Sequence, residues 1–222
     1  MESLSARLRQ YAAPVWEAQL RHPVVLGIGD GTLPVEKFAF WVRQDYLFLI
    51  DYSRLFGYAV ARAPDLATMT TFADLLSATL KTEMDLHRSY CAEFGITPED
   101  LERETKAPTT QAYTDFLLRV AATADFPHLV AALLPCLWGF AEIGQTLKRR
   151  GLPPEPRYAR WIEMYASEEF VRLAEWCRQL LDRIGGDLPA RIQQQLAEIF
   201  LTSSRYELAF WDMADRLERW PV

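Results

Sequence analysis

Apolar residues recur every three or four positions along most of the chain, which is the spacing of one face of an α-helix. No segment alternates apolar and polar residues as a half-buried strand does, and only 10 of the 222 residues are glycine. The pattern predicts an all-α fold. The predicted helices span residues 3–21, 34–62, 66–94, a short segment from 97, about 109–124, 126–150, 157–184 with a break near Ser167, and 188–220.

The predicted connections between these helices are short. After His22-Pro23 we expect a glycine-rich loop at residues 27–32, and the proline-rich stretch 152–156 is the most linker-like segment. The sequence contains no internal repeat, no low-complexity tract and no long linker. We therefore expect residues 1–222 to form one domain.

Asp45, Cys136 and Glu207 each lie at the centre of an otherwise apolar helix face. Burying an unpaired carboxylate costs on the order of several kcal/mol, so the two acids require partners. Such partners occur in a functional pocket, but also where a buried acid bridges helices or pairs with an Arg such as Arg205. Cys136 could equally pack as a small apolar residue. The preceding Pro135 removes a main-chain N–H and favours a local distortion beside the thiol.

Glu83 and His87 are four residues apart and share one helix face, a spacing that is compatible with a metal site. The chain contains only three His, and neither of the others has a similar partner nearby. We therefore favour an internal hydrogen bond between Glu83 and His87 over metal ligation.

The composition narrows the possible partners and compartment. Half of the residues are hydrophobic, which is typical of a globular protein. The formal net charge is −6 and the pI is near 5.2. Because the sequence is acidic and lacks a run of basic residues, we expect neither a nucleic acid nor a membrane as a partner. No run of about 20 apolar residues and no leader-like N-terminus is present. Cys91, Cys136 and Cys177 form no CxxC pair, so we expect neither disulfides nor a zinc site. These features predict a cytoplasmic protein.

Several segments occur in a specific order over essentially the whole chain. They are residues 40–46 (FWVRQDY), 133–138 (LLPCLW), 158–165, 206–214 (YELAFWDMA), and the shorter groups Thr82-Glu83 with Leu86-His87 and Pro108-Thr109 with Ala112-Tyr113. In this combination the sequence resembles the cysteine-containing type of the TenA family, also called thiaminase II or aminopyrimidine aminohydrolase.

The resemblance implies a heme-oxygenase-like multi-helix bundle without heme, assembled as a homotetramer and needing no metal or organic cofactor. It also implies an enzyme of thiamin salvage. The expected reaction converts 4-amino-5-aminomethyl-2-methylpyrimidine to the hydroxymethylpyrimidine and releases ammonia, and thiamin itself could also be cleaved. Two other readings stay open. One is a metal-dependent oxidase on the same fold that uses Glu83 and His87, and the other is a non-catalytic pyrimidine-binding or regulatory protein.

Position by position, the resemblance assigns Cys136 as the nucleophile and Glu207 as the acid/base carboxylate. It assigns Asp45 to the aminopyrimidine edge of the substrate. The expected pocket aromatics are Tyr113, Tyr165, Phe210, Phe48 and Phe140. Many relatives have Tyr at the positions of Phe48 and Phe140, and each replacement removes a hydroxyl, so the precise substrate is left open.

Overall fold

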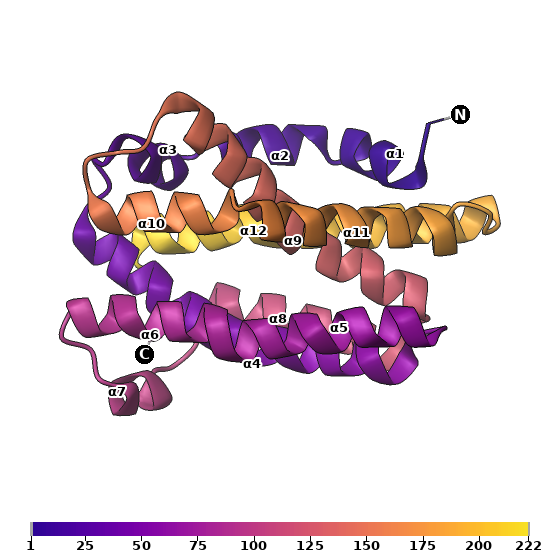
Figure 1. The fold of residues 1–222 in the computed structure, drawn as a ribbon, viewed down its shortest axis with the longest axis horizontal. Helices are drawn as coiled ribbons and strands as arrows, with labels where there is room; N and C mark the ends of the chain where they lie inside the picture. The colour runs from indigo at the N-terminus through magenta and orange to yellow at the C-terminus, as the bar shows by residue number, and fades with distance from the viewer. Residues whose placement is uncertain (1, 222) are drawn as a thin grey trace. The chain divides into compact units, whose positions relative to one another are not determined.

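A computed structural model describes residues 2–221, and in that range every regular element is helical (Figure 1). The predicted all-α fold is therefore confirmed. The elements are α1 (Leu4–Tyr11), α2 (Ala13–Leu20), α3 (Pro23–Asp30), α4 (Val35–Arg62), α5 (Leu66–Ala78), the π-helix η1 (Thr79–Glu83), α6 (Met84–Glu93), α7 (Pro98–Arg103), α8 (Pro108–Thr123), α9 (Phe126–Arg150), α10 (Pro156–Tyr165), α11 (Glu168–Gly185) and α12 (Ala190–Arg216).

The N-terminal region differs from the sequence prediction in two places. The helix expected over residues 3–21 is divided into α1 and α2, because Pro14 lies in the first turn of α2 and has no N–H to continue α1. The loop expected at residues 27–32 is largely the helix α3. Pro23 begins α3 and the Nδ1 atom of His22 accepts a hydrogen bond of 3.2 Å from Val24 N. The chain turns only at Gly31, where φ is +83°.

The middle and the end of the chain follow the prediction more closely. The segment expected as one helix over 66–94 is α5, η1 and α6 in succession, which form one continuous rod in Figure 1. The break near Ser167 is confirmed, and Ser167 Oγ accepts from Phe170 N as a helix cap. The last helix ends at Arg216, short of the predicted Trp220, because Leu217 adopts the left-handed conformation with φ of 51°.

The described chain falls into two compact units. The first unit contains the chain up to Pro34 together with Val130–Trp211, and the second contains Val35–Leu129 together with the chain from Asp212. One boundary lies directly before α4, and the other two lie inside α9 and α12. The single domain expected for residues 1–222 stays a prediction.

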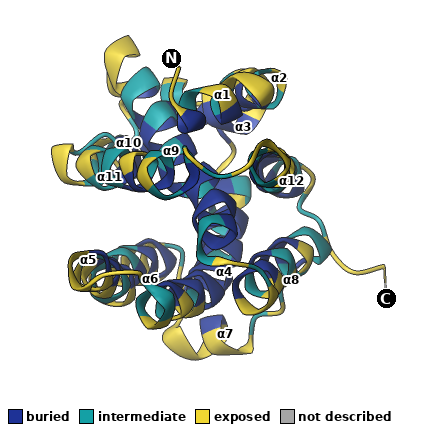
Figure 2. Cartoon of the chain, turned by 90° about the vertical axis from the view of Figure 1, so that its right-hand side faces the viewer, coloured by how far each residue is buried: buried dark blue, intermediate teal, exposed yellow. Residues whose placement is uncertain are grey.

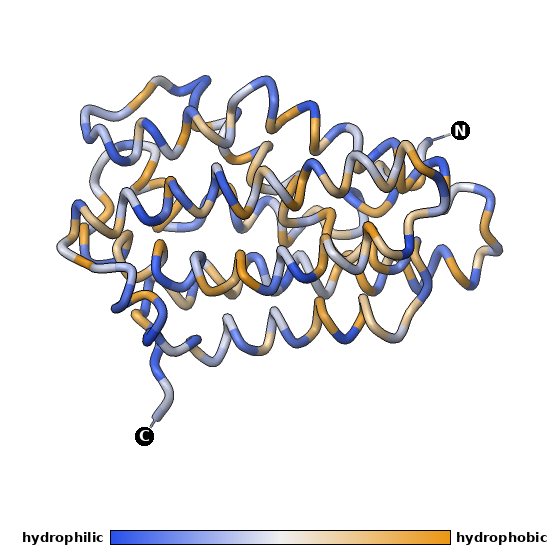
Figure 3. The backbone as a smooth tube through the Cα atoms, turned by 60° about the horizontal axis from the view of Figure 1, so that its bottom comes forward, coloured by the Kyte–Doolittle hydropathy of each residue, from blue (hydrophilic) through white to orange (hydrophobic). Residues whose placement is uncertain are grey.

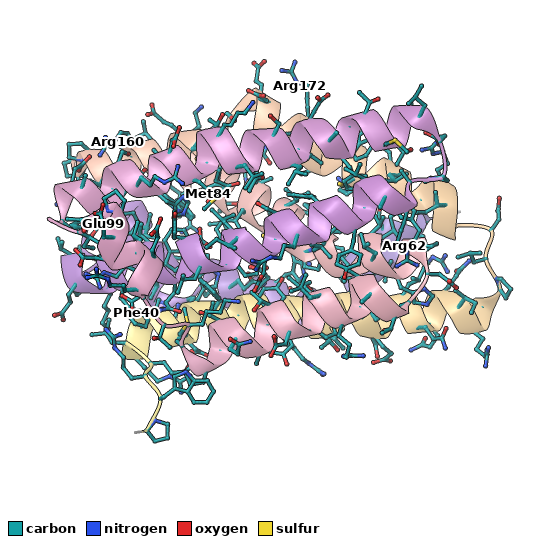
Figure 4. All side chains as sticks on the ribbon, turned by 90° about the horizontal axis from the view of Figure 1, so that it is seen from below. Phe40, Arg62, Met84, Glu99, Arg160 and Arg172 are labelled. Atoms are coloured by element: carbon teal, nitrogen blue, oxygen red, sulfur yellow. The ribbon has the colours of Figure 1, made fainter. Side chains whose placement is uncertain are left out.

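Helix α4 forms the core of the second unit. It contacts α5, η1, α6, α7 and α8, and Figure 2 shows it largely buried while the outer faces of α5, α6 and α8 are exposed. At its C-terminal end the guanidinium of Arg62, labelled in Figure 4, donates to the carbonyl oxygens of Ala121 and Ala124. These bonds satisfy carbonyls that the end of α8 would otherwise leave unpaired.

In the first unit, α9 and α12 supply much of the core. Trp16 of α2 donates a hydrogen bond of 2.9 Å from Nε1 to Ser204 Oγ of α12, and its ring lies 5.1 Å from that of Trp138 in α9. Polar and apolar stretches alternate along each helix of the tube in Figure 3, as expected for helices with one buried face.

Within the described residues, α9 is the one helix that is long and apolar enough to cross a membrane by length and composition. Of its most apolar window, 72% is buried inside the protein. A core helix has the same composition, and the burial of α9 agrees with that role.

Gly144 of α9 should tolerate no side chain. A Cβ atom at this position would lie 2.7 Å from the carbonyl carbon of Tyr165 and 2.8 Å from the main-chain nitrogen of Ala166. We expect Gly144→Ala to lower the free energy of unfolding by about 1–3 kcal/mol in urea titrations, because main-chain atoms cannot move aside cheaply.

Gly139→Ala in the same helix is the matched control. Its Cβ would meet nothing within 4 Å, and we expect it to be neutral or to stabilise by up to about 1 kcal/mol. Equal stabilities of the two variants would contradict this packing.

Candidate functional site

Helices α9 and α12 run parallel where they touch in the first unit. The hydroxyl of Ser203 in α12 donates a hydrogen bond of 2.7 Å to the main-chain oxygen of Ala132 in α9, 71 positions away in sequence. About two turns further along both helices, the rings of Phe140 and Trp211 lie 5.5 Å apart. This second pair has the same separation of 71 positions as the first. Two contacts with one constant separation define a parallel register.

The register places Cys136 level with Glu207. These two residues are also separated by 71 positions, and they fall midway between the two contacts. Cys136 lies four residues before Phe140 and shares its face of α9. Glu207 lies four residues after Ser203 and shares its face of α12. Both side chains therefore project into the contact between the two helices, at the same height.

Burial differs between these two side chains in a chemically useful way. Glu207 is 4% exposed, whereas Cys136 is half-buried, so part of this residue is open to solvent. A nucleophilic thiol needs access to its substrate, and a group that exchanges protons with the reacting atoms works best where water is excluded. Pro135, directly before Cys136, lies inside α9, which continues through it without a break.

An aromatic cluster lies beside this pair in the first unit. The ring of Phe140 lies 4.8 Å from that of Tyr165, and both also contact Trp161, at 5.9 and 4.7 Å respectively. Tyr165 is 2% exposed. Phe210, which is also buried, lies three residues after Glu207 on α12. The structure thus brings together Phe140 and Tyr165 of the predicted pocket residues, and adds Trp161 and Trp211 to them.

Asp45 belongs to the second unit and is paired with His87. Nε2 of His87 lies 2.6 Å from Asp45 Oδ2, and Nδ1 lies 2.8 Å from the main-chain oxygen of Glu83. Burial by itself lowers the pKa of His87, but the hydrogen bond and negative charge of Asp45, assisted by Glu83, raise this pKa above its ordinary value. Among the described residues Oδ1 of Asp45 has no hydrogen-bond partner, so this oxygen can accept from a ligand.

A group of aromatic rings begins one turn after Asp45 in the same unit. Phe48, one turn after Asp45, stacks on Tyr52 with ring centroids 5.2 Å apart, and its ring lies 5.1 Å from that of Tyr113 in α8. Phe48 and Tyr113 are 3% and 1% exposed. The structure therefore brings the rings of Phe48 and Tyr113 into contact, and their role in a substrate pocket stays a prediction.

Gln44 is a structural residue that the sequence analysis missed. Its side-chain oxygen accepts from Ala107 N and from Thr110 Oγ1, both at 2.8 Å, and its amide donates to the oxygen of Thr105. These bonds fix the start of α8, whose own N-cap residue, Ala107, offers no side-chain acceptor. The helix that carries Tyr113 is in this way tied to the helix that carries Asp45.

The partner of His87 was also missed. The expected bond between Glu83 and His87 exists, but it uses the main-chain oxygen of Glu83 rather than its carboxylate, and Asp45 takes the other ring nitrogen. Within residues 2–221 no group of three His, Cys, Asp or Glu side chains is arranged to hold a metal ion. With both ring nitrogens engaged, His87 is better suited to positioning Asp45 than to ligating a metal.

The chain is similar over nearly its whole length to proteins of known family. Residues 9–217 match the family model described as the TENA/THI-4/PQQC family. An aminopyrimidine aminohydrolase of Halalkalibacterium halodurans is 48% identical, with 98% of each chain covered. The solved structure of a TenA homologue from P. horikoshii has a TM-score of 0.89 at 30% identity and covers 97% of this chain and 99% of that one. The solved structure of a domain of unknown function from Shewanella denitrificans, which has a heme-oxygenase-like fold, is 14% identical with a TM-score of 0.71. It covers 95% of this chain and 91% of that one, and at this identity it confirms the fold alone.

Thiol reagents should distinguish Cys136 from the two other cysteines. Cys91 and Cys177 are 0% exposed, and burial raises the pKa of Cys91 to about 11 and raises the pKa of Cys177 further. We expect native protein at pH 8 to take up one equivalent of iodoacetamide, at Cys136, and unfolded protein to take up three, as peptide mass spectrometry will measure. The control is Cys136→Ser, which should stay unlabelled while native. Labelling of Cys91 or Cys177 at a rate comparable to that of Cys136 would show that the burial described here is wrong.

Proposed function

The chain belongs to the TENA/THI-4/PQQC family, and from this membership we infer that it is an aminopyrimidine aminohydrolase, a hydrolase of thiamin metabolism. The observation that carries the inference is the 48% identity to an aminopyrimidine aminohydrolase over 98% of both chains. The alignment covers 98% of the relative, so the similarity is not confined to one segment. The level placement of Cys136 and Glu207 adds a chemical reason for the same activity.

The proposed substrate is 4-amino-5-aminomethyl-2-methylpyrimidine, which is hydrolysed to the hydroxymethylpyrimidine and ammonia. We propose that thiamin is also cleaved, because its leaving group is attached to the same methylene of the same ring. In both cases the bond that breaks joins a nitrogen to a carbon beside an electron-poor ring. A nucleophile that adds to the ring can therefore expel that nitrogen.

In the proposed mechanism the Cys136 thiolate adds to ring carbon C6, next to the carbon that carries the methylene. The ring electrons then expel the amine and leave an exocyclic methylene. Water adds to that methylene, and departure of the thiolate restores the ring. The support for this role is that Cys136 is half-buried, whereas Cys91 and Cys177 are buried and burial raises the pKa of both thiols above the ordinary value.

We propose that Glu207 moves the protons of this reaction. The departing amine needs a proton, and the water that replaces it must lose one, so a single carboxyl group can serve both steps in turn. The support is its burial and its place beside Cys136 in the α9–α12 register. The aromatic rings of Phe140, Tyr165 and Phe210 supply flat apolar surface for a pyrimidine.

Asp45 is proposed to bind the aminopyrimidine edge through its free oxygen Oδ1, with Phe48 and Tyr113 as neighbouring aromatic rings. The support is that Asp45 is 5% exposed and its carboxylate is oriented by His87. The assembly as a homotetramer, the cytoplasmic location and the independence from metal and organic cofactors are further proposals. Light scattering on the purified 25.6 kDa chain tests the first of these.

Ammonia release from 4-amino-5-aminomethyl-2-methylpyrimidine tests the function and the nucleophile together. We expect turnover by the wild type and a loss of about 10³-fold or more in Cys136→Ser, because the covalent step is removed. Cys91→Ser, which changes a buried cysteine, is the matched control and should keep its activity if it folds.

Three results would contradict the proposal in different ways. Full activity of Cys136→Ser would remove the covalent mechanism but keep the hydrolase. Tight binding of pyrimidine with no turnover by the wild type would instead favour the non-catalytic reading. Activity that is lost with a chelator and restored with iron would favour the metal-dependent reading.

A further inference from the structure

His87 is a buried histidine whose two ring nitrogens both lie against oxygen atoms. It is 1% exposed, Nδ1 is 2.8 Å from the main-chain oxygen of Glu83, and Nε2 is 2.6 Å from Oδ2 of Asp45. Both distances are those of well-formed hydrogen bonds. The two contacts together determine how many protons the Asp45–His87 pair holds.

A main-chain carbonyl oxygen can only accept a hydrogen bond, so Nδ1 of His87 must carry a proton. In a neutral imidazole Nε2 would then be unprotonated and would face the oxygen of a carboxylate, with two acceptors only 2.6 Å apart. The contact therefore requires one more proton between Nε2 and Oδ2. The pair is either an imidazolium with a carboxylate, or a neutral imidazole with a carboxylic acid.

Relative basicity places this proton on His87. An imidazole ordinarily has a pKa of about 6.5 and an Asp carboxyl one of about 3.9, so the ring retains the proton when the two share it. The charged groups that act on His87 are Asp45 from α4 and Glu83 from η1, and both are acidic. The next residue on α6, Arg88, is bonded to Asp85 and to the hydroxyl of Tyr46. Both acidic neighbours favour the imidazolium.

The local backbone is built to make this pair. The π-helix η1 ends at Glu83, the residue whose carbonyl oxygen accepts from Nδ1. Short π-helical insertions are rare, and they occur frequently at functional sites. On the other side, the ring of Trp41 lies 5.9 Å from that of His87. The imidazole is thus held from α4 and from its own helix.

We propose that His87 is an imidazolium in the native protein and is the positioning residue that keeps Asp45 a carboxylate, so that Asp45 selects pyrimidines that carry an amino group. This proposal rests on the proposed function, in which Asp45 binds the aminopyrimidine edge. Because His87 occupies Oδ2, the oxygen presented to the ligand is Oδ1. As part of an anion, Oδ1 can only accept a hydrogen bond.

This requirement discriminates between two closely similar rings. A 4-amino group donates an N–H to Oδ1, whereas a 4-oxo group would place a second acceptor against it. A polar pair that cannot form a hydrogen bond in a buried site loses affinity, because both groups have given up water. Without the imidazolium, Asp45 could take up a proton, and Oδ1–H could then donate to a 4-oxo group. Removing His87 should therefore weaken the discrimination as well as the binding.

The protonation state can be measured without any ligand. The chain has three His, so uniform nitrogen-15 labelling of histidine gives three imidazoles, and the His87→Gln spectrum identifies the signals of His87. We expect both nitrogens of His87 to have the chemical shifts of protonated nitrogens, and to keep them as the pH rises past about 6.5, where an ordinary imidazole loses its proton. An unprotonated ring nitrogen on His87 at neutral pH would overturn the proposal.

The selectivity is tested by titration calorimetry with 4-amino-5-hydroxymethyl-2-methylpyrimidine and its 4-oxo counterpart, neither of which carries the amine leaving group. Gln can still donate to Asp45 but cannot hold the charge. We expect the ratio of the two dissociation constants to fall by about tenfold in His87→Gln. His128→Gln, which changes another largely buried His, is the matched control and should keep the wild-type ratio.

An unchanged ratio in a folded His87→Gln protein would overturn the proposal even if the wild type binds the amino compound well. Failure of the wild type to bind either pyrimidine would instead count against the proposed function, and the nitrogen-15 spectra would still decide the state of His87. If His87→Gln does not fold, the spectra of His22→Gln and His128→Gln identify the remaining signals as those of His87, and these signals confirm or overturn the imidazolium.

Discussion

The parallel contact between α9 and α12 is the constraint on which the proposed chemistry depends. One buried hydrogen bond, from the Ser203 hydroxyl to the oxygen of Ala132, and one ring contact, between Phe140 and Trp211, hold the two helices in a single register. A shift by one residue would rotate each side chain by about 100° relative to the partner helix. The level placement of a thiol and a carboxylate therefore follows from packing that involves neither of them.

Around Asp45 the energetic cost of burying a charge is offset by an ion pair. A carboxylate on an apolar face is destabilising unless it is paired, and here its partner is a histidine that a π-helix orients. The ion pair is neutral as a whole, yet it leaves one carboxylate oxygen available. The positive charge of His87 therefore has two effects. It stabilises the buried carboxylate of Asp45, and it restricts the free oxygen of Asp45 to ligand atoms that donate a hydrogen bond.

Much of the fold and part of the candidate site could be predicted from the helical periodicity of the sequence. The features that were not predicted depend on contacts between residues far apart in the chain. The long helices, and the polar residues Asp45, Cys136 and Glu207 on apolar faces, follow from the spacing of three and four. Helix α3 was not predicted because Gly27 and Gly29 are typical of a loop. In the structure Gly29 lies within the helix, where Leu147 packs against it and leaves no room for a side chain. The bond from His87 to Asp45 joins positions 42 residues apart and depends on a π-helix that no periodic pattern signals.

The most direct test of the central claim, that the Cys136 sulfur attacks C6 of the pyrimidine, uses a substrate analogue with chlorine at C6. Addition of the thiolate at that carbon is followed by loss of chloride, which leaves a stable thioether on the protein. Intact and peptide mass spectrometry should then find one pyrimidine per chain, attached to Cys136, and none on Cys136→Ser. An unmodified Cys136 after long incubation, in a protein that still hydrolyses the unsubstituted pyrimidine, would contradict the account.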